Sequence, residues 1–282
     1  MVSRGLEVAK EAKFVQARQP DTPRQLYHYT KLKNVFGMLD VGSKSVSFWL
    51  KNNKDKNDAR ELKYGRELME KVRDYYRSKG QSTLLEQMTD FDNSYSLSFT
   101  EGVLDAHMLD EYGTVRFEFD LRNYKDEEIY KCEYYTEEDL AELYQVMIAD
   151  IQSMAGITKE SPIELKRMKL LRQFTLELDL KAKIGSIKLK DEWETEGEWR
   201  YVLHKQENDE RYFQDSDGYE RLKMFVPIKY LTGITLLYDE SSKKTMKKFQ
   251  KELKNYRNWN RMGRFNVKLM NIKRRGDESR NA

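Results

Sequence analysis

The side chains of this chain that could do chemistry gather in short segments, and the first of these holds His28. In Leu26–Thr30 the histidine stands between two tyrosines in a β-prone run. A neutral imidazole donates one hydrogen bond and accepts another, which suits the binding of a ribose hydroxyl. The alternative is a half-buried histidine whose ring bonds a backbone carbonyl, and the residues alone leave both interpretations open.

The second segment, Glu196–Arg200, carries two carboxylates and a guanidinium. In an extended strand Glu196, Glu198 and Arg200 point to one face, and Trp199 points to the other. If the carboxylates are buried, Arg200 must offset their charge. The competing interpretation is a solvated strand face with no chemical role.

A third group consists of hydroxyls on one predicted strand. Ser96, Ser98 and Thr100 alternate with apolar residues, so their side chains share a face. They could line a polar pocket or face water. The stretch 57–61 could also position a ligand, but it is more typical of a turn and helix cap.

Alternating and helical periodicities predict the elements that position these residues. Strands are expected at 26–30, 45–50, 95–100, 114–121, 186–189, 198–204, 224–230, 233–238 and 265–272, and helices at 31–39, 59–89, 136–155, 160–182 and 241–259. Strands and helices mix without regular alternation, which favours an α+β fold over a doubly wound sheet. We expect a mixed, mostly antiparallel split sheet with flanking helices.

The same patterns suggest three parts of the chain. Residues 1–23 are expected to form an N-terminal helix or arm, and residues 24–240 the main α+β domain. Residues 241–282 are expected to form a basic C-terminal helix and tail, packed on that domain or extending from it.

Composition indicates a folded protein of a reducing compartment. Hydrophobic residues make up 39% and aromatic residues 12% of the 282 positions, which is enough for a core and argues against disorder. The one cysteine, Cys132, excludes an intrachain disulfide and a Cys-based zinc site. The N-terminus lacks an apolar signal region, and no run approaches about 18 apolar residues, so we expect a cytoplasmic protein with no membrane partner.

Charge is distributed unevenly along the chain. Residues 243–275 hold 13 Lys or Arg and one acid, a net charge of +12, whereas residues 101–150 hold 15 acids and four bases. The basic segment could contact nucleic acid or an acidic partner. The alternative is a solvated helix face, docked on the protein's own acidic segment.

Taken in order along the chain, these segments resemble the bacterial domain-of-unknown-function family numbered 2971. The matching residues are Leu26–Thr30, Asn57, Asp58, Glu61, Ser98–Thr100, Tyr112, Phe119, Asp120 and Glu196–Arg200. The resemblance covers roughly residues 24–240. In one departure, Met108 is followed by Leu109 where family members often carry Trp, which would alter a stacking surface.

A looser resemblance links the opening of the chain to the ADP-ribosyltransferase fold, including DNA-modifying toxins of that class. These enzymes use a first-strand His or Arg, a middle Tyr or Ser and a late Glu. His28, Ser98 and Glu198 (or Glu196) occur in that order. The resemblance implies an ADP-ribosyltransferase-like fold and NAD as the substrate, with no metal required.

The resemblance also implies roles for individual residues. Glu198 would stabilise an oxocarbenium-like state at the ribose, and Glu196 would orient or deprotonate the acceptor. His28 would hold the adenosine-side ribose or the carboxamide, and Tyr29 or Tyr112 would stack on nicotinamide. The positions expected to contact NAD are His28, Tyr29, Thr30, Ser96, Ser98, Tyr112 and Arg200.

Three hypotheses of function follow. The first is an NAD-using ADP-ribosyltransferase or NAD glycohydrolase, serving as a toxin or phage-defence effector, with an acceptor that the sequence does not identify. The second is a protein that binds or acts on nucleic acid through residues 243–275. The third is a catalytically inert interaction module.

Overall fold

The computed structural model describes residues 25–53, 59–78, 80, 94–102, 106–124, 128–155, 182, 185–190 and 197–272. The predicted arm at 1–23, the helix at 160–182 apart from Ala182, and the tail beyond Ile272 lie outside the described residues. The described part is a mixed α+β fold built on a mostly antiparallel sheet, so this prediction is confirmed. None of the described helices is long and apolar enough to cross a membrane.

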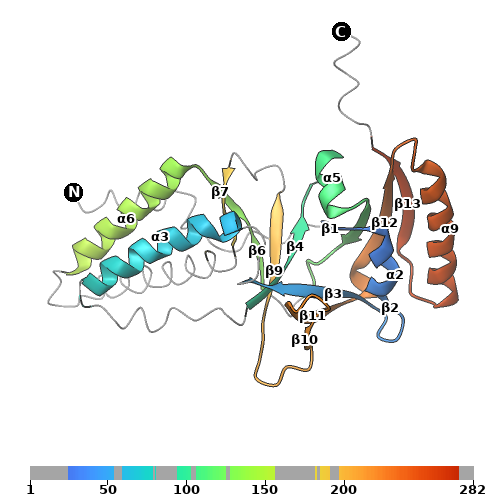
Figure 1. The fold of residues 1–282 in the computed structure, drawn as a ribbon, viewed down its shortest axis with the longest axis horizontal. Helices are drawn as coiled ribbons and strands as arrows, with labels where there is room; N and C mark the ends of the chain where they lie inside the picture. Colours follow the sequence, from blue (N-terminus) through green and yellow to red (C-terminus); the bar gives the residue numbers. More distant parts are fainter. Residues whose placement is uncertain are drawn as a thin grey trace, which may run out of the picture.

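The strands are β1 (Leu26–Thr30), β2 (Leu39–Asp40), β3 (Ser45–Asn52), β4 (Ser94–Thr100), β5 (Val115–Phe119), β6 (Glu128–Lys131), β7 (Glu133–Tyr135), β8 (Ile187–Leu189), β9 (Glu198–His204), β10 (Tyr212–Gln214), β11 (Glu220–Pro227), β12 (Leu231–Tyr238) and β13 (Asn266–Asn271). The helices are α2 (Val35–Met38), α3 (Ala59–Ser78), α5 (Ala106–Tyr112), α6 (Glu137–Ala155) and α9 (Lys243–Trp259), with 3₁₀ turns at Leu32–Asn34 and Ile228–Tyr230. Figure 1 labels most of them along the chain.

The main sheet has the strand order β10-β11-β3-β4-β1-β5-β12-β13, with β2 beside β3 and with β9 and β6 branching from β4. Only the β12–β13 pair is parallel in the described part of this sheet. A second, two-stranded sheet joins β7 and β8 in parallel.

The sheet forks at β4. One edge of β4 pairs with β9 along all seven of its residues. The other edge is divided, because Tyr95 and Ser96 pair with β3 whereas Thr100 pairs with β1. β3 and β1 therefore leave the same strand in different directions.

The main core fills the space on one face of the fork, which we call the core face. Phe48 of β3, Phe99 of β4 and Phe119 of β5 have ring centroids 5.8–6.1 Å apart. Phe36, next to the sheet, contacts the ring of Phe249 on α9. Strand alternation supplies this layer, since every second residue of each strand turns inward.

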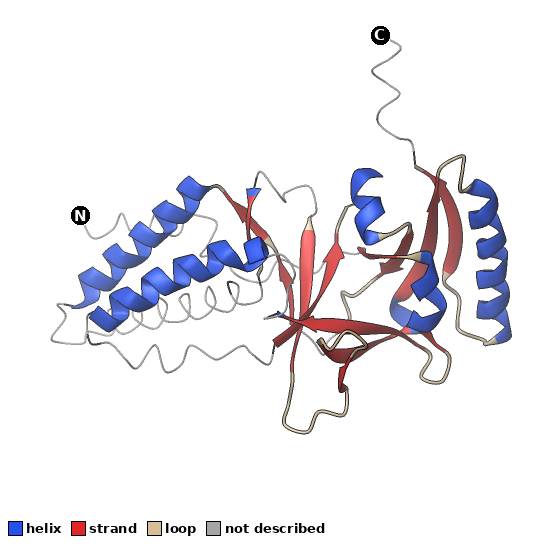
Figure 2. Cartoon of the chain, in the orientation of Figure 1, coloured by secondary structure: helices blue, strands red, loops and turns tan. Residues whose placement is uncertain are grey.

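The chain from β12 to β13 forms a parallel crossover through α9. Met246 and Leu253 on one side of α9 belong to the main core, and β13 pairs with β12 from Gly233 to Tyr238. The basic helix predicted at 241–259 is thus packed on the main sheet. Figure 2 shows it as the helix at the right edge of the molecule.

At the other end of the molecule α3 and α6 lie side by side and pack near the small β7–β8 sheet (Figure 1). Their apolar residues form a second, smaller cluster. Its buried members are Leu68, Met69, Val72, Tyr76, Leu143, Ile148, Ala182 and Ile187.

A close approach between β1 and the α5–β5 turn gives a test of this packing. Gly113 has φ +109°, and a Cβ there would lie 2.3 Å from the backbone carbonyl of Thr30. We expect Gly113→Ala to lower the free energy of unfolding by about 2 kcal/mol or more, because both the backbone angle and the contact forbid a side chain. Urea denaturation followed by circular dichroism would measure it.

Gly37 in α2 serves as the control, since a Cβ there meets nothing within 4 Å. Gly37→Ala should be neutral or stabilising by up to about 1 kcal/mol. Equal stability of the two variants would contradict the packing of β1 against this turn.

Candidate functional site

Glu198 lies at the start of β9 and is held by three side chains. Arg200 donates to its carboxylate from Nε at 2.9 Å, Lys188 of β8 forms an ion pair with it, and Ser98 of β4 donates its hydroxyl. Glu198, Lys188 and Arg200 are buried. We call these four residues the Glu198 cluster.

The cluster decides between the two interpretations of the Glu196–Arg200 segment. The prediction that Arg200 would offset a buried carboxylate is confirmed for Glu198, and the solvated-face alternative is wrong for both residues. Trp199 turns to the core face, as the alternation predicted. Lys188 was not expected as a partner, and Glu196 lies outside the described residues.

His28 occupies the gap where β1 and β3 part. Its ring lies edge-on to Phe48 at 5.0 Å and to Phe99 at 5.9 Å, and its Nδ1 is 3.1 Å from the carbonyl oxygen of Ser98. A carbonyl can only accept, so Nδ1 carries the hydrogen and donates. Burial lowers the pKa of His28, against the opposing effect of that hydrogen bond.

This geometry matches the second interpretation of His28, a half-buried histidine whose ring bonds a backbone carbonyl. β4 offers a backbone carbonyl at Ser98 on the edge that faces the fork, and the half-buried imidazole satisfies it. Unpaired buried carbonyls are costly, so the ring substitutes here for a missing strand partner.

The strand register places His28 and Glu198 on opposite faces of the sheet. Tyr27 pairs with Thr100, and Thr100 pairs with Glu198, so these three side chains share one face. His28 is one residue further and points to the core face. Of the three residues that occur in the ADP-ribosyltransferase-like order, Ser98 contacts Glu198 through its hydroxyl, whereas His28 lies on the other face.

The other residues expected near NAD include two in β1 that have structural contacts. Tyr29 is buried against Leu109 and Leu237. Thr30 is buried, and its hydroxyl accepts a hydrogen bond from Asn34 at 3.1 Å.

Ser96 and Tyr112, which were also expected near NAD, are not members of the Glu198 cluster. The Ser96 hydroxyl donates to Asn53 at 2.6 Å and ties β4 to the end of β3. Tyr112 lies at the end of α5 and is exposed. Asn57 and Asp58 fall outside the described residues.

Sequence reasoning missed a second buried ion pair, on the same face as Glu198. Arg116 and Glu118 of β5 join at 2.8 Å, and Thr235 donates its hydroxyl to Glu118. The Arg116 guanidinium lies 4.4 Å from the centroid of the Tyr27 ring. The alternation of residues 114–121 predicts a polar face on this strand. The burial of that face depends on the strands on both sides of β5, which are far away in the sequence.

The exposed side of α9 carries the charge that the sequence located at 243–275. Its five exposed lysines, which we call the basic face of α9, are Lys244, Lys247, Lys248, Lys251 and Lys254. Beyond the helix, Arg261, Arg264 and Lys268 are exposed as well. The ion pairs found for α9 in the described structure are local: Lys243 with Glu240 at 3.0 Å and Lys248 with Glu252 at 4.0 Å.

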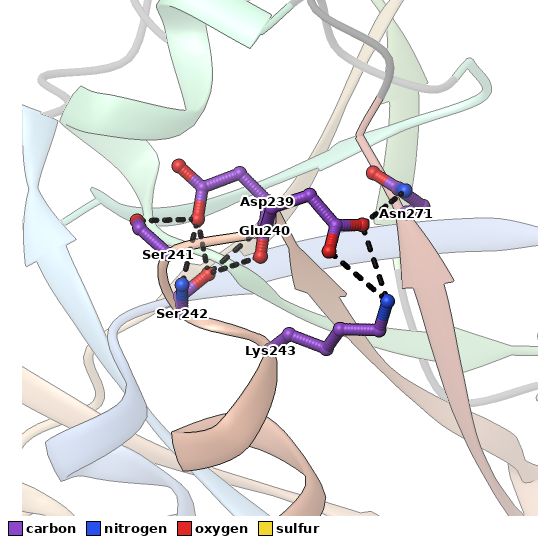
Figure 3. Close-up of polar contacts among 6 residues, drawn as sticks. All are labelled: Asp239, Glu240, Ser241, Ser242, Lys243 and Asn271. Atoms are coloured by element: carbon purple, nitrogen blue, oxygen red, sulfur yellow. Dashed lines mark hydrogen bonds and ion pairs between the residues drawn. The ribbon is translucent and has the colours of Figure 1, made fainter.

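Hydrogen bonds hold the start of α9 in place (Figure 3). Asp239 accepts from the backbone of Ser242 at 2.8 Å and from its hydroxyl at 2.6 Å. Glu240 accepts from Lys243 and from Asn271 of β13. The helix is therefore fixed to the sheet at its first turn as well as through its apolar side.

The acidic helix α6 lies far from this surface. α6 is at one end of the molecule and α9 at the other (Figure 1). The alternative that the basic helix docks on the acidic segment is therefore wrong for α6.

Comparisons of the chain with protein-family models, with curated proteins and with solved structures found no match. The resemblance to family 2971 thus stays a prediction. Among the described residues no group of three or more His, Cys, Asp or Glu side chains could hold a metal ion.

From the ion pairs of the Glu198 cluster we expect that a substitution of Glu198 lowers the free energy of unfolding. Glu198→Gln removes the carboxylate that faces Lys188 and Arg200, and loss of one partner from a buried ion pair costs about 3–5 kcal/mol. Urea denaturation should show this loss. Asp120→Asn is the control, since its partner Arg122 is exposed and the expected loss is much smaller than at Glu198.

One result would show that the role of Glu198 is catalytic and not mainly structural. If Glu198→Gln folds as stably as the wild type but abolishes nicotinamide release from NAD, the carboxylate is catalytic and its structural role is minor.

Because of the environment of the His28 ring, we expect the free energy of unfolding to depend on pH. Because the pKa of His28 in the folded protein lies below its ordinary value of 6.5, the unfolded chain binds the proton more readily, and stability falls as pH drops below about 6.5. His28→Asn keeps an amide donor but cannot titrate, so the free energy of unfolding should depend less on pH between about 6.5 and 5. Denaturation at a series of pH values would measure it.

The wild type measured over the same pH series provides the comparison. An unchanged pH dependence in His28→Asn would show that the imidazole does not stay neutral in the folded protein.

Proposed function

We propose that this protein binds nucleic acid through the basic face of α9. The observation that carries the proposal is a helix fixed by its apolar side in the main core while five lysines of its opposite side remain exposed. The acid found beside them in the described structure is Glu252, whose carboxylate lies 4.0 Å from the Lys248 ammonium.

The geometry of the basic face suits a phosphate backbone. Lys244, Lys247, Lys251 and Lys254 recur every three or four residues, so they form a stripe along about 15 Å of helix. Because α9 is held at its first turn and along its apolar side, the lysines are displayed on a fixed support. Binding would release condensed counterions, and this release supplies most of the free energy of non-specific nucleic-acid binding.

NAD cleavage receives less support from the geometry. An ADP-ribosyltransferase-like fold and NAD as the substrate stay predictions, resting on the order of His28, Ser98 and Glu198 along the chain. The carboxylate that would stabilise the ribose cation is engaged by Lys188 and Arg200, and His28 points to the opposite face.

The proposal predicts a salt-dependent loss of binding in a charge variant. Replacing Lys247, Lys248, Lys251 and Lys254 by Gln should weaken binding to duplex or single-stranded oligonucleotides by about tenfold or more at about 0.1 M salt. The slope of log affinity against log salt should become shallower by about 0.7–0.9 for each lost phosphate contact. Fluorescence anisotropy over a salt series measures both quantities.

A second variant tests whether binding depends on where the lysines lie or only on the net charge of the protein. Lys63, Arg66, Lys71 and Arg77 are exposed on α3, and their replacement by Gln changes the net charge equally. This variant should bind as the wild type does. Equal losses in the two variants, or no loss in either, would overturn the proposal.

A further inference from the structure

The outer face of β3, β10 and β11 mixes aromatic rings with cations. This outer face is the side turned away from the core, and its residues are Ser47, Trp49, Lys51, Phe213, Arg221, Lys223 and Phe225. Trp49 is 59% exposed and Phe225 is 40% exposed. The three strands lie along the lower side of the molecule in Figure 1.

The rings and cations of the outer face contact one another. Trp49 meets Phe213 edge-on at 5.0 Å, and the Lys223 ammonium lies 5.2 Å from the Phe213 centroid. Tyr219, next to β11, is 43% exposed and has Arg221 at 5.4 Å. These contacts hold large exposed rings in position, whereas a typical soluble surface leaves such rings scattered.

The chemistry of this face selects among occupants. Protein interfaces favour aromatic residues and Arg but are depleted in Lys, whereas Lys223 is exposed beside Trp49. A ligand that combines flat π faces with negative charge matches both features, and this is the chemistry of a nucleic-acid strand. In a duplex the bases are stacked on one another, so the rings of a sheet face reach only unpaired bases.

We infer that the outer face of β3, β10 and β11 binds single-stranded nucleic acid, with bases stacking on Trp49 and Phe225 and the phosphates near Lys223. The inference rests on the proposed function for its class of ligand, but it concerns a second surface. α9 contacts phosphates of any strand, and the outer face adds a preference for unpaired bases.

Single substitutions at Trp49 test the stacking. Trp49→Ala should weaken binding to a mixed-sequence 20-mer of single-stranded DNA or RNA by about fivefold to 100-fold. Trp49→Phe should retain most of the affinity, because a ring remains. Duplex binding of the same sequence should be unchanged in both variants. Running the DNA and RNA arms in parallel shows which strand is preferred.

Tyr112→Ala is the control, because it removes an exposed ring from α5, away from this face. Circular dichroism and urea denaturation establish that each variant is folded. If Trp49→Ala and Phe225→Ala both bind single strands as tightly as the wild type, the inference is wrong.

The two proposals fail in different ways. Loss of all binding in the α9 lysine variant together with unchanged single-strand binding in both Trp49→Ala and Phe225→Ala supports the proposed function and overturns the second surface. Loss of single-strand binding in Trp49→Ala together with unchanged binding in the lysine variant does the reverse.

Discussion

β4 has two edges, and three strands pair with them. β9 takes one edge along its whole length, so β3 and β1 must share the other, one at each end. The carbonyl of Ser98 lies between them and accepts from the His28 imidazole. Because β3 and β1 diverge at this point, the sheet encloses the core cluster around Phe48 and Phe99, and β3 carries β11 and β10 out to form a separate surface.

The face of the sheet opposite the core holds buried charge. Glu198 lies between Arg200 and Lys188, and Arg116 pairs with Glu118 on β5, three strands away. Buried ion pairs add little net stability, because the cost of desolvation offsets the attraction. They do constrain register, since a slip of one residue would turn these charges into the aromatic core.

The acidic helix α6 and the basic helix α9, which are separate along the chain, are also far apart in the folded molecule. The acidic α6 packs with α3 at one end of the molecule, and the basic α9 packs on β12 and β13 at the other (Figure 1). This separation leaves the lysines of α9 facing solvent. A polyanion approaching that end meets a positive field that the acidic end opposes only weakly, because charges further apart than about 10 Å are screened.

Patterns within short segments of the chain specify much of the local structure. Period-two alternation located β4 and β5 to within two residues, the Glu198–His204 strand was predicted with its observed bounds, and the helical period located α9. The short strands β6, β7 and β10 and the seven-residue α5 were missed, because none of these segments shows a clear apolar–polar alternation or a helical repeat. The burial of Glu198, its contact with Lys188 and the opposite orientation of His28 follow from the packing of the strands and could not be derived from any one segment. Alternation fixes the faces within one strand, but the shared face of two strands depends on the register between segments far apart in the chain, and that register is set when they pack.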